Sequence, residues 1–208
     1  MTPATDALAL LREGNARFVA NQSEAASTLS ATRRVTLVAG QDPIAIVLGC
    51  SDSRVPAELV FDQGLGDLFV IRVAGNIVAP SQVGSVEFAA ARFETRLVVV
   101  MGHSQCGAVS ATLEDVLGRG TTHSRHLRSI VDRIRPSVET LCSGRDPLDV
   151  DALMRDAVRA NVRASANHLR HGSELLEQLI AQDGLLVVGA EYALESGLVT
   201  FFDGVPKA

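Results

Sequence analysis

The chain has 208 residues, 47% of them hydrophobic, which is enough for one globular domain with a substantial core. Its formal net charge of −5 argues against a nucleic-acid-binding surface, because phosphate backbones are bound by basic faces. No stretch approaches the roughly 18 to 20 consecutive apolar residues that span a bilayer, so no membrane segment is expected.

The amino-terminal segment and the cysteines indicate a protein of the cytoplasm. Residues 1–19 carry acidic side chains early and no uninterrupted apolar stretch behind a basic start, which is unlike a secretory signal peptide. The chain has three cysteines, an odd number that does not suggest a disulfide framework. In a reducing compartment such cysteines serve more often as metal ligands, nucleophiles or core residues, so their positions must decide.

The hydrophobic pattern predicts helices and strands in alternation. An amphipathic helix is expected at residues 7–18, where Leu8, Leu11 and Phe18 supply the apolar positions, and residues 21–33 are small and polar, as in a connector. Short apolar runs that mostly lack alternation, as strands buried on both faces of a parallel sheet do, follow at residues 44–49, 68–75, 97–102 and 185–190. Helical patterns lie between them at residues 83–93, 106–118 and 149–184.

This order of elements predicts an α/β fold with a short, mostly parallel β-sheet of about four strands plus an edge strand, flanked by helices. The last apolar run, residues 197–202, suits the edge strand or a hairpin partner. We expect a single domain over residues 1–208, with an N-terminal helical arm at residues 1–35 and the α/β core at residues 36–208.

Potential metal ligands directly follow two of the predicted strands. Cys50 and Asp52 come after the first run, and His103 and Cys106 come after the third. Open parallel sheets bind ligands beyond the carboxyl ends of their strands, so two adjacent strand ends would bring these side chains together. Zinc accepts thiolate, imidazole and carboxylate in a tetrahedron, whereas calcium and magnesium prefer oxygen. Cys50, His103 and Cys106 would be permanent ligands, whereas the Asp52 carboxylate could bind or leave the ion. Such a set indicates a catalytic zinc site with a position open to water.

The two motifs and their separation resemble those of the β-class carbonic anhydrases. Residues 50–54, CSDSR, match the Cys-x-Asp-x-Arg motif of that family, and residues 102–107, GHSQCG, match its His-x-x-Cys motif. The resemblance covers most of the chain, because further segments match at residues 11–19, 40–78, 84–93 and 187–199.

This resemblance implies reversible hydration of carbon dioxide to bicarbonate and a proton, by attack of zinc-bound hydroxide on carbon dioxide. One zinc ion per subunit would be bound by Cys50, His103 and Cys106, with Asp52 and Arg54 as a catalytic pair. Two thiolates leave the zinc ion less positive charge to acidify water than three neutral imidazoles would. Asp52, held by Arg54, is therefore expected to accept a hydrogen bond from the hydroxide and to orient it. Freed from Arg54, the Asp52 carboxylate would become a fourth ligand in a closed state.

The resemblance also predicts a small substrate pocket. Gln41, nine residues before the first ligand, matches a glutamine that would donate a hydrogen bond to a substrate oxygen. Phe69 matches a pocket phenylalanine, and Phe88 stands where plant-type members have a tyrosine, so the hydroxyl of that tyrosine is missing. Gly102 completes the predicted substrate-binding set, because a residue without a side chain lets the backbone approach the metal site.

One branch of the family closes its site when bicarbonate occupies a pocket containing a tryptophan three residues before the first ligand. Val47 occupies that position and the chain has no tryptophan, although Arg72 and Tyr192 match other members of the pocket. We therefore expect an open site at ordinary pH, with Asp52 off the metal.

The expected partners are carbon dioxide and bicarbonate, and a second copy of the chain. The resemblance implies a homodimer or homotetramer in which the N-terminal arm reaches the partner and the site lies at the dimer interface. Two alternatives share the ligand motifs: a carbon disulfide or carbonyl sulfide hydrolase on the same scaffold, and a noncatalytic protein that binds zinc or bicarbonate. Asp52, Arg54 and Gln41 argue against the noncatalytic alternative, because a structural zinc site needs neither a catalytic pair nor a substrate-side donor.

Overall fold

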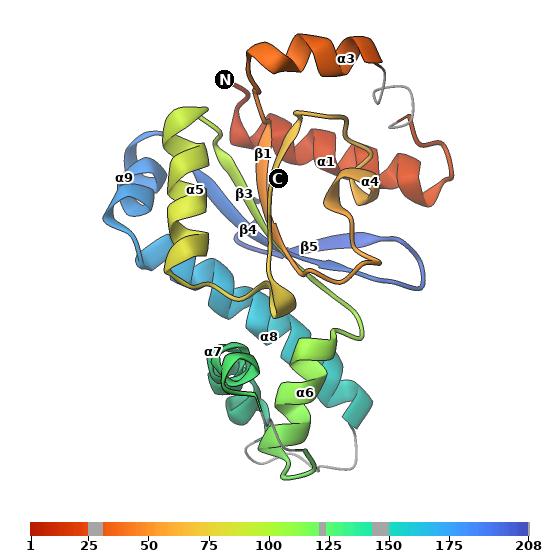
Figure 1. Cartoon of the computed structure of the whole chain (residues 1–208), viewed down its shortest axis with the longest axis vertical. Helices are drawn as coiled ribbons and strands as arrows, with labels where there is room; N and C mark the ends of the chain where they lie inside the picture. Colours follow the sequence, from red (N-terminus) through yellow and green to blue (C-terminus); the bar gives the residue numbers. More distant parts are fainter. Residues whose placement is uncertain (25–30, 121–123, 143–149, 208) are drawn as a thin grey trace.

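The computed structural model describes residues 1–24, 31–120, 124–142 and 150–207, which are built around one five-stranded β-sheet (Figure 1). In chain order the strands are β1 (Ala45–Gly49), β2 (Leu68–Arg72), β3 (Leu97–His103), β4 (Leu186–Tyr192) and β5 (Val199–Asp203). Their order in the sheet is β2-β1-β3-β4-β5, with the first four parallel and β5 antiparallel to β4. The predicted α/β fold, with four parallel strands and an edge strand, is confirmed.

Helices cover both faces of the sheet, which explains why its central strands are apolar at consecutive positions. Every residue of β1 and β3 is buried, as expected for parallel strands between two helical layers. One face packs against α1 (Ala4–Val19) and α4 (Ala57–Val60). The other face packs against α5 (Pro80–Arg92), α8 (Val150–His171) and α9 (Glu174–Gln182).

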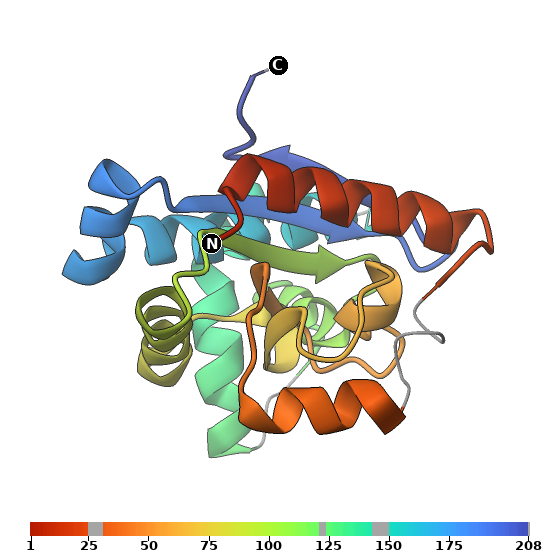
Figure 2. The ribbon, with the colours of Figure 1, turned by 90° about the horizontal axis from the view of Figure 1, so that it is seen from above.

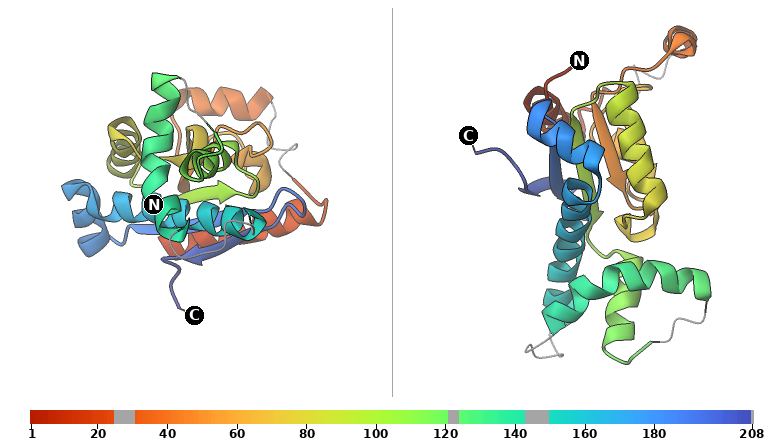
Figure 3. Two further views of the ribbon diagram at one scale, coloured as in Figure 1. Left: turned by 90° about the horizontal axis from the view of Figure 1, so that it is seen from below. Right: turned by 90° about the vertical axis from the view of Figure 1, so that its left-hand side faces the viewer.

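A third group of helices lies beyond the carboxyl ends of the strands. It consists of α6 (Gly107–Val116), α7 (Arg125–Cys142) and the first turns of α8, which Figure 3 shows projecting from the sheet. Their apolar side chains form a separate cluster that contains Cys50 and Cys106. At the amino ends of the strands, α3 (Ala31–Thr36) and a 3-10 turn (Leu37–Ala39) precede β1. The fold thus encloses the carboxyl ends of β1 and β3.

Helix α1 lies along the sheet of its own chain (Figure 2). Leu8 and Leu11 are 3% and 0% exposed, and Phe18 packs at the edge of the same cluster. The buried amide of Asn15 secures the helix: Nδ2 donates to the carbonyls of Val60 and Gly197, at 3.0 and 2.8 Å. The apolar stripe of the predicted arm is thus covered within the chain, while Leu10 and Val19 on its other side are 43% and 40% exposed. Contact between the arm and a partner stays a prediction.

Two predicted segments differ in extent from the observed elements: one strand is shorter, and one helical region is divided into two helices. The second strand stops at Arg72 instead of residue 75, because Gly75 (φ 70°) and Asn76 (φ 42°) turn the chain in the left-handed region. The helical region predicted at 149–184 forms two helices. Ser173 begins the second one, since its hydroxyl accepts a hydrogen bond from the Leu176 N–H at 3.2 Å.

Helix α7 is absent from the predicted elements. Its many charged residues and an internal Pro136 conceal an apolar stripe made of Val131, Ile134 and Val138. The predicted connector at residues 21–33 ends in the first turn of α3, and its residues 25–30 lie outside the described residues. Within the described ranges, none of the helices combines the length and the apolar character needed to cross a membrane.

Candidate metal centre

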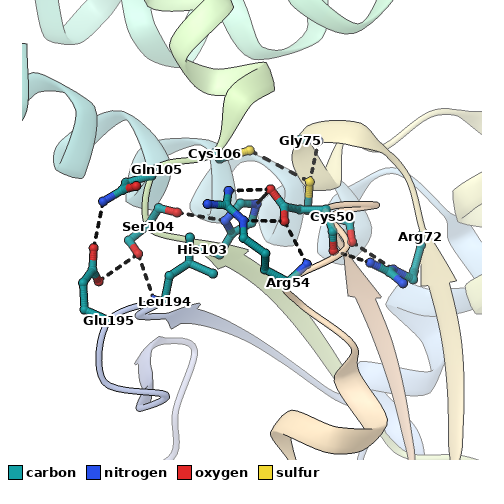
Figure 4. Close-up of polar contacts among 11 residues, drawn as sticks. Cys50, Arg54, Arg72, Gly75, His103, Ser104, Gln105, Cys106, Leu194 and Glu195 are labelled. Atoms are coloured by element: carbon teal, nitrogen blue, oxygen red, sulfur yellow. Dashed lines mark hydrogen bonds and ion pairs between the residues drawn. The ribbon is translucent and has the colours of Figure 1, made fainter.

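Cys50, His103 and Cys106 meet where β1 and β3 end (Figure 4). The two strands are adjacent and parallel, with Gly49 opposite Met101, so the residues that follow them emerge side by side. One ligand atom from each of the three side chains lies within 4.8 Å of the other two, and the sulfurs are 4.0 Å apart. All three residues are buried. The structure brings together the three residues that the sequence predicts as metal ligands.

The donor atoms fit a zinc ion. The Nδ1–H of His103 donates to the carbonyl of Ser104 at 2.9 Å, which leaves Nε2 as a lone-pair donor. This Nε2 is buried and has no hydrogen-bond partner within the described residues, an arrangement that costs free energy unless a ligand completes it. The sulfur–sulfur distance of 4.0 Å is close to the roughly 3.8 Å edge of a tetrahedron with zinc–sulfur bonds of about 2.3 Å.

The two thiols differ strongly in acidity. Their mutual hydrogen bond lowers the pKa of Cys50 and raises the pKa of Cys106. The backbone N–H of Gly75 also donates to the Cys50 sulfur at 3.3 Å, which further lowers the pKa of Cys50. One sulfur of the pair is therefore stabilised as a thiolate, which is the form that binds a metal.

A carboxylate stands beside these ligands and is held by an arginine. Arg54 donates from Nε to Asp52 Oδ1 at 2.9 Å and from a terminal nitrogen to Oδ2 at 2.7 Å. The backbone N–H of Arg54 donates to Oδ1 as well, at 3.0 Å. These hydrogen bonds from Arg54 hold the pKa of Asp52 well below its usual value, so the carboxylate is ionised at neutral pH. Its Oδ2 lies 3.9 Å from His103 Nε2, near the ligands but bound to Arg54.

Known proteins resemble this chain over most of its length. A sequence profile described as carbonic anhydrase matches residues 45–199. The crystal structure of the β-carbonic anhydrase CafA of Aspergillus fumigatus superposes with a TM-score of 0.75 at 26% identity, covering 98% of this chain and 92% of that one. The chain belongs to the β-carbonic anhydrase family.

Two bacterial relatives carry the same name. Carbonic anhydrase 2 of Mycobacterium tuberculosis is 40% identical over 196 residues, which are 94% of this chain and 91% of that protein. A carbonic anhydrase of Mycolicibacterium smegmatis is 41% identical over 190 residues, covering 91% and 88% of the two chains. The protein is thus an enzyme of the carbonic anhydrase class, which interconverts carbon dioxide and bicarbonate. Neither the carbon disulfide or carbonyl sulfide alternative nor the noncatalytic one is favoured by these relatives.

Arg72 supports the first carbonic anhydrase motif through its backbone. It donates from Nε to the carbonyl of Cys50 at 3.0 Å and from a terminal nitrogen to the carbonyl of Asp52 at 2.5 Å. Because Arg72 is paired in register with Gly49, its side chain starts next to the motif. The sequence resemblance assigns Arg72 only to a bicarbonate pocket and misses this contact. Val47 of that pocket is fully buried within β1, and Tyr192 is buried at the end of β4.

Gln41, Phe69 and Phe88, predicted to bind substrate, lie toward the amino ends of the strands, away from the metal centre at their carboxyl ends. Gln41 precedes β1, whereas Cys50 follows it. Phe69 pairs in register with Ile46, roughly 13 Å from Cys50 along a strand that rises about 3.3 Å per residue. Phe88 packs against Phe69 with ring centroids 6.2 Å apart and is still 54% exposed. Within one chain these side chains do not reach the metal centre, so their predicted role requires a second copy.

Gly102 has a packing role that differs from its predicted substrate-binding role. A Cβ atom added there would lie 2.6 Å from a methyl group of Val162 and 3.2 Å from one of Val158. Both valines belong to α8, so the missing side chain lets α8 approach β3 closely. Gly107 has no heavy atom within 4 Å of its hypothetical Cβ and does not share this constraint. The contacts at Gly102 thus explain why a side chain is excluded there, and its place among the substrate-binding residues stays a prediction.

Proposed function

We propose that the protein catalyses the reversible hydration of carbon dioxide as a zinc enzyme. Cys50, His103 and Cys106 would bind the ion, and Asp52 with Arg54 would act on the nucleophile. The observation that carries this proposal is the convergence of three ligand atoms within 4.8 Å, one of them a buried imidazole nitrogen that lacks a hydrogen-bond partner in the described part of the chain. Membership in the carbonic anhydrase family supports the choice of reaction.

Asp52 and Arg54 have different roles at the site: Asp52 orients the nucleophile, and Arg54 holds Asp52. When bound, zinc supplies the Lewis acidity that makes water a nucleophile near neutral pH. The ionised Asp52 carboxylate is an acceptor only, so it accepts a hydrogen bond from the attacking water or hydroxide and fixes its direction. Its low pKa makes it a poor base, and it orients the nucleophile without storing the proton. Arg54 donates hydrogen bonds to both carboxylate oxygens, which would keep Asp52 from becoming a ligand of a bound zinc ion.

Metal analysis combined with stopped-flow hydration tests this proposal directly. The purified protein should contain about one zinc ion per chain, since the described residues hold one such cluster. The same preparation should hydrate carbon dioxide and lose that activity when a chelator removes the metal. A protein that binds zinc stoichiometrically but does not accelerate hydration would contradict the proposed reaction.

We further propose that the smallest complete unit is a homodimer, alone or paired into a tetramer. Gln41, Phe69 and Phe88 lie too far from the metal ligands of their own chain to contact the substrate there. The exposed ring of Phe88 is instead available to a second copy. A chain from the crystal structures of two tetrameric β-carbonic anhydrases of Sordaria macrospora is 25% identical to this chain, with a TM-score of 0.72.

A heterodimer experiment distinguishes a partner's Gln41 from the chain's own. One chain carries Cys106→Ala, which removes its own metal centre, and the other carries Gln41→Ala. The one intact metal centre then lies in the chain that carries Gln41→Ala, so it has a wild-type Gln41 only if that residue comes from the partner. We expect this arrangement, and kcat/KM per bound zinc should therefore equal that of wild type. In the reciprocal pair, Cys106→Ala and Gln41→Ala share one chain and the other is wild type. Loss of one hydrogen bond should then lower kcat/KM about two- to tenfold. The opposite pattern would place Gln41 in the site of its own chain.

A further inference from the structure

One carboxylate from the connection between β4 and β5 holds the loop that joins two of the proposed zinc ligands (Figure 4). Glu195 Oε2 accepts a hydrogen bond from the Ser104 hydroxyl at 3.2 Å. Its Oε1 accepts one from the side-chain amide of Gln105 at 2.9 Å. Ser104 and Gln105 are the residues between His103 and Cys106, so Glu195 contacts the whole loop between these ligands.

The contacts of Ser104 orient its hydroxyl toward Glu195. Its oxygen already accepts a hydrogen bond from the Leu194 N–H at 2.9 Å, so the hydroxyl proton is directed to Glu195. The backbone N–H of Ser104 donates to the carbonyl of Tyr192 at 3.0 Å. Ser104 is thereby fixed at its backbone and at its side chain. Its carbonyl, which accepts from His103 Nδ1, is held in place by the same contacts.

Gln105 adds a conformational reason for the clamp. Its φ of 55° lies in the left-handed region, which residues other than glycine rarely adopt. This backbone angle turns the loop so that Cys106 can face Cys50 at 4.0 Å between sulfurs. The hydrogen bond from the Gln105 amide to Glu195 holds the residue in this unfavourable conformation.

We propose that Glu195 is a positioning residue for the metal centre. Among the described residues its carboxylate is hydrogen-bonded to Ser104 and Gln105 and to none of the proposed ligands, so it acts by fixing the orientation of the His103 ring and the place of Cys106. The inference rests on the proposed zinc site. Glu195 belongs to neither ligand motif and is about ninety residues from the loop it holds, so its role emerges from the contact between the loops.

Metal release tests this role independently of turnover. Zinc transfer from Glu195→Ala to an excess of chelator should be about tenfold faster than from wild type, the lower end of the effect of outer-shell partners on metal sites. In cobalt-substituted Glu195→Ala, the visible absorption bands should shift, because the ligand geometry relaxes. Glu195→Gln should release zinc nearly as slowly as wild type, since its amide can accept from Ser104 and pair with a rotated Gln105 amide.

Glu177→Ala is the matched control, because Glu177 is an exposed glutamate on α9, the helix that leads into the amino end of β4. It should release zinc at the wild-type rate and leave the cobalt spectrum unchanged. Equal release rates for Glu195→Ala and Glu177→Ala, from protein that holds one zinc ion per chain, would overturn the positioning role alone. A wild-type protein that binds neither zinc nor cobalt would overturn the proposed function as well.

Discussion

Replacing Cys106 with alanine should give a folded protein that holds no zinc and has lost carbon dioxide hydration. Two ligands would remain, and the imidazole and single thiolate alone do not fix an ion in a buried tetrahedral site. The fold should survive, because the substitution removes a single buried sulfur atom from a cluster that many other apolar side chains form. The loss of hydration should exceed the roughly 10- to 100-fold cost typical of outer-shell changes.

Cys142→Ala is the matched control for this variant. Cys142 lies at the end of α7 and packs at the edge of the apolar cluster that contains Cys50 and Cys106. In Cys142→Ala, the zinc content per chain, measured by inductively coupled plasma emission, should be unchanged. The rate of carbon dioxide hydration, measured by stopped flow, should be unchanged as well. Stoichiometric zinc in Cys106→Ala would remove Cys106 from the proposed ligand set, and a lost circular dichroism signal in Cys106→Ala alone would assign it a structural role.

The sequence places each ligand motif correctly, because both motifs directly follow apolar runs that become buried strands. Cys50 follows β1 and His103 ends β3, so their convergence needs only that these two strands be neighbours. Local periodicity does not reveal the order of the strands in the sheet, however. The resemblance to a known family implies that the two motifs meet, and the observed order β2-β1-β3 shows that β1 and β3 are neighbours.

Residues that act across the sheet or between loops are less accessible from the sequence. Arg72 reaches the backbone of Cys50, 22 residues away, and Glu195 reaches Gln105, 90 residues away. Neither contact leaves a periodic or motif-like signal, because hydrogen bonds between distant loops impose no spacing on the chain. The packing of Gly102 against α8 is a further contact that the sequence does not reveal, because a glycine beside a ligand suggests only that the backbone approaches the metal.

The distribution of the substrate-side residues has a physical meaning of its own. A parallel strand has its beginning and its end on opposite edges of the sheet, so Gln41 and Cys50 cannot share a site within one chain. The aromatic side chains of Phe69, Phe88 and Phe93 contact one another near the beginning of the strands, and Phe88 is largely exposed. A second copy that covers these rings would complete two sites at once, which makes assembly a requirement for full activity in the proposed function.

Replacing Asp52 with alanine should separate catalysis from metal binding. The variant should retain about one zinc ion per chain, because Asp52 Oδ2 accepts a hydrogen bond from Arg54 at 2.7 Å and is not one of the three clustered ligand atoms. Its kcat should fall by about 100-fold or more, the usual range for a lost acid–base or orienting group. Loss of zinc together with activity would instead make Asp52 a ligand and contradict the open arrangement.

Asp203→Ala provides the matched control for Asp52→Ala, because Asp203 is also paired with an arginine, Arg170, at 2.7 Å. Asp203 ends β5, at the edge of the sheet opposite to β2, so breaking its ion pair removes similar chemistry away from the metal centre and from the substrate-side residues on β2. Turnover of Asp203→Ala should match wild type. If both variants lost activity equally, the effect of Asp52 would be one of stability. A loss confined to Asp52→Ala, with zinc retained, requires that its carboxylate act on the nucleophile, since the ligands and the remaining fold are the same in both proteins.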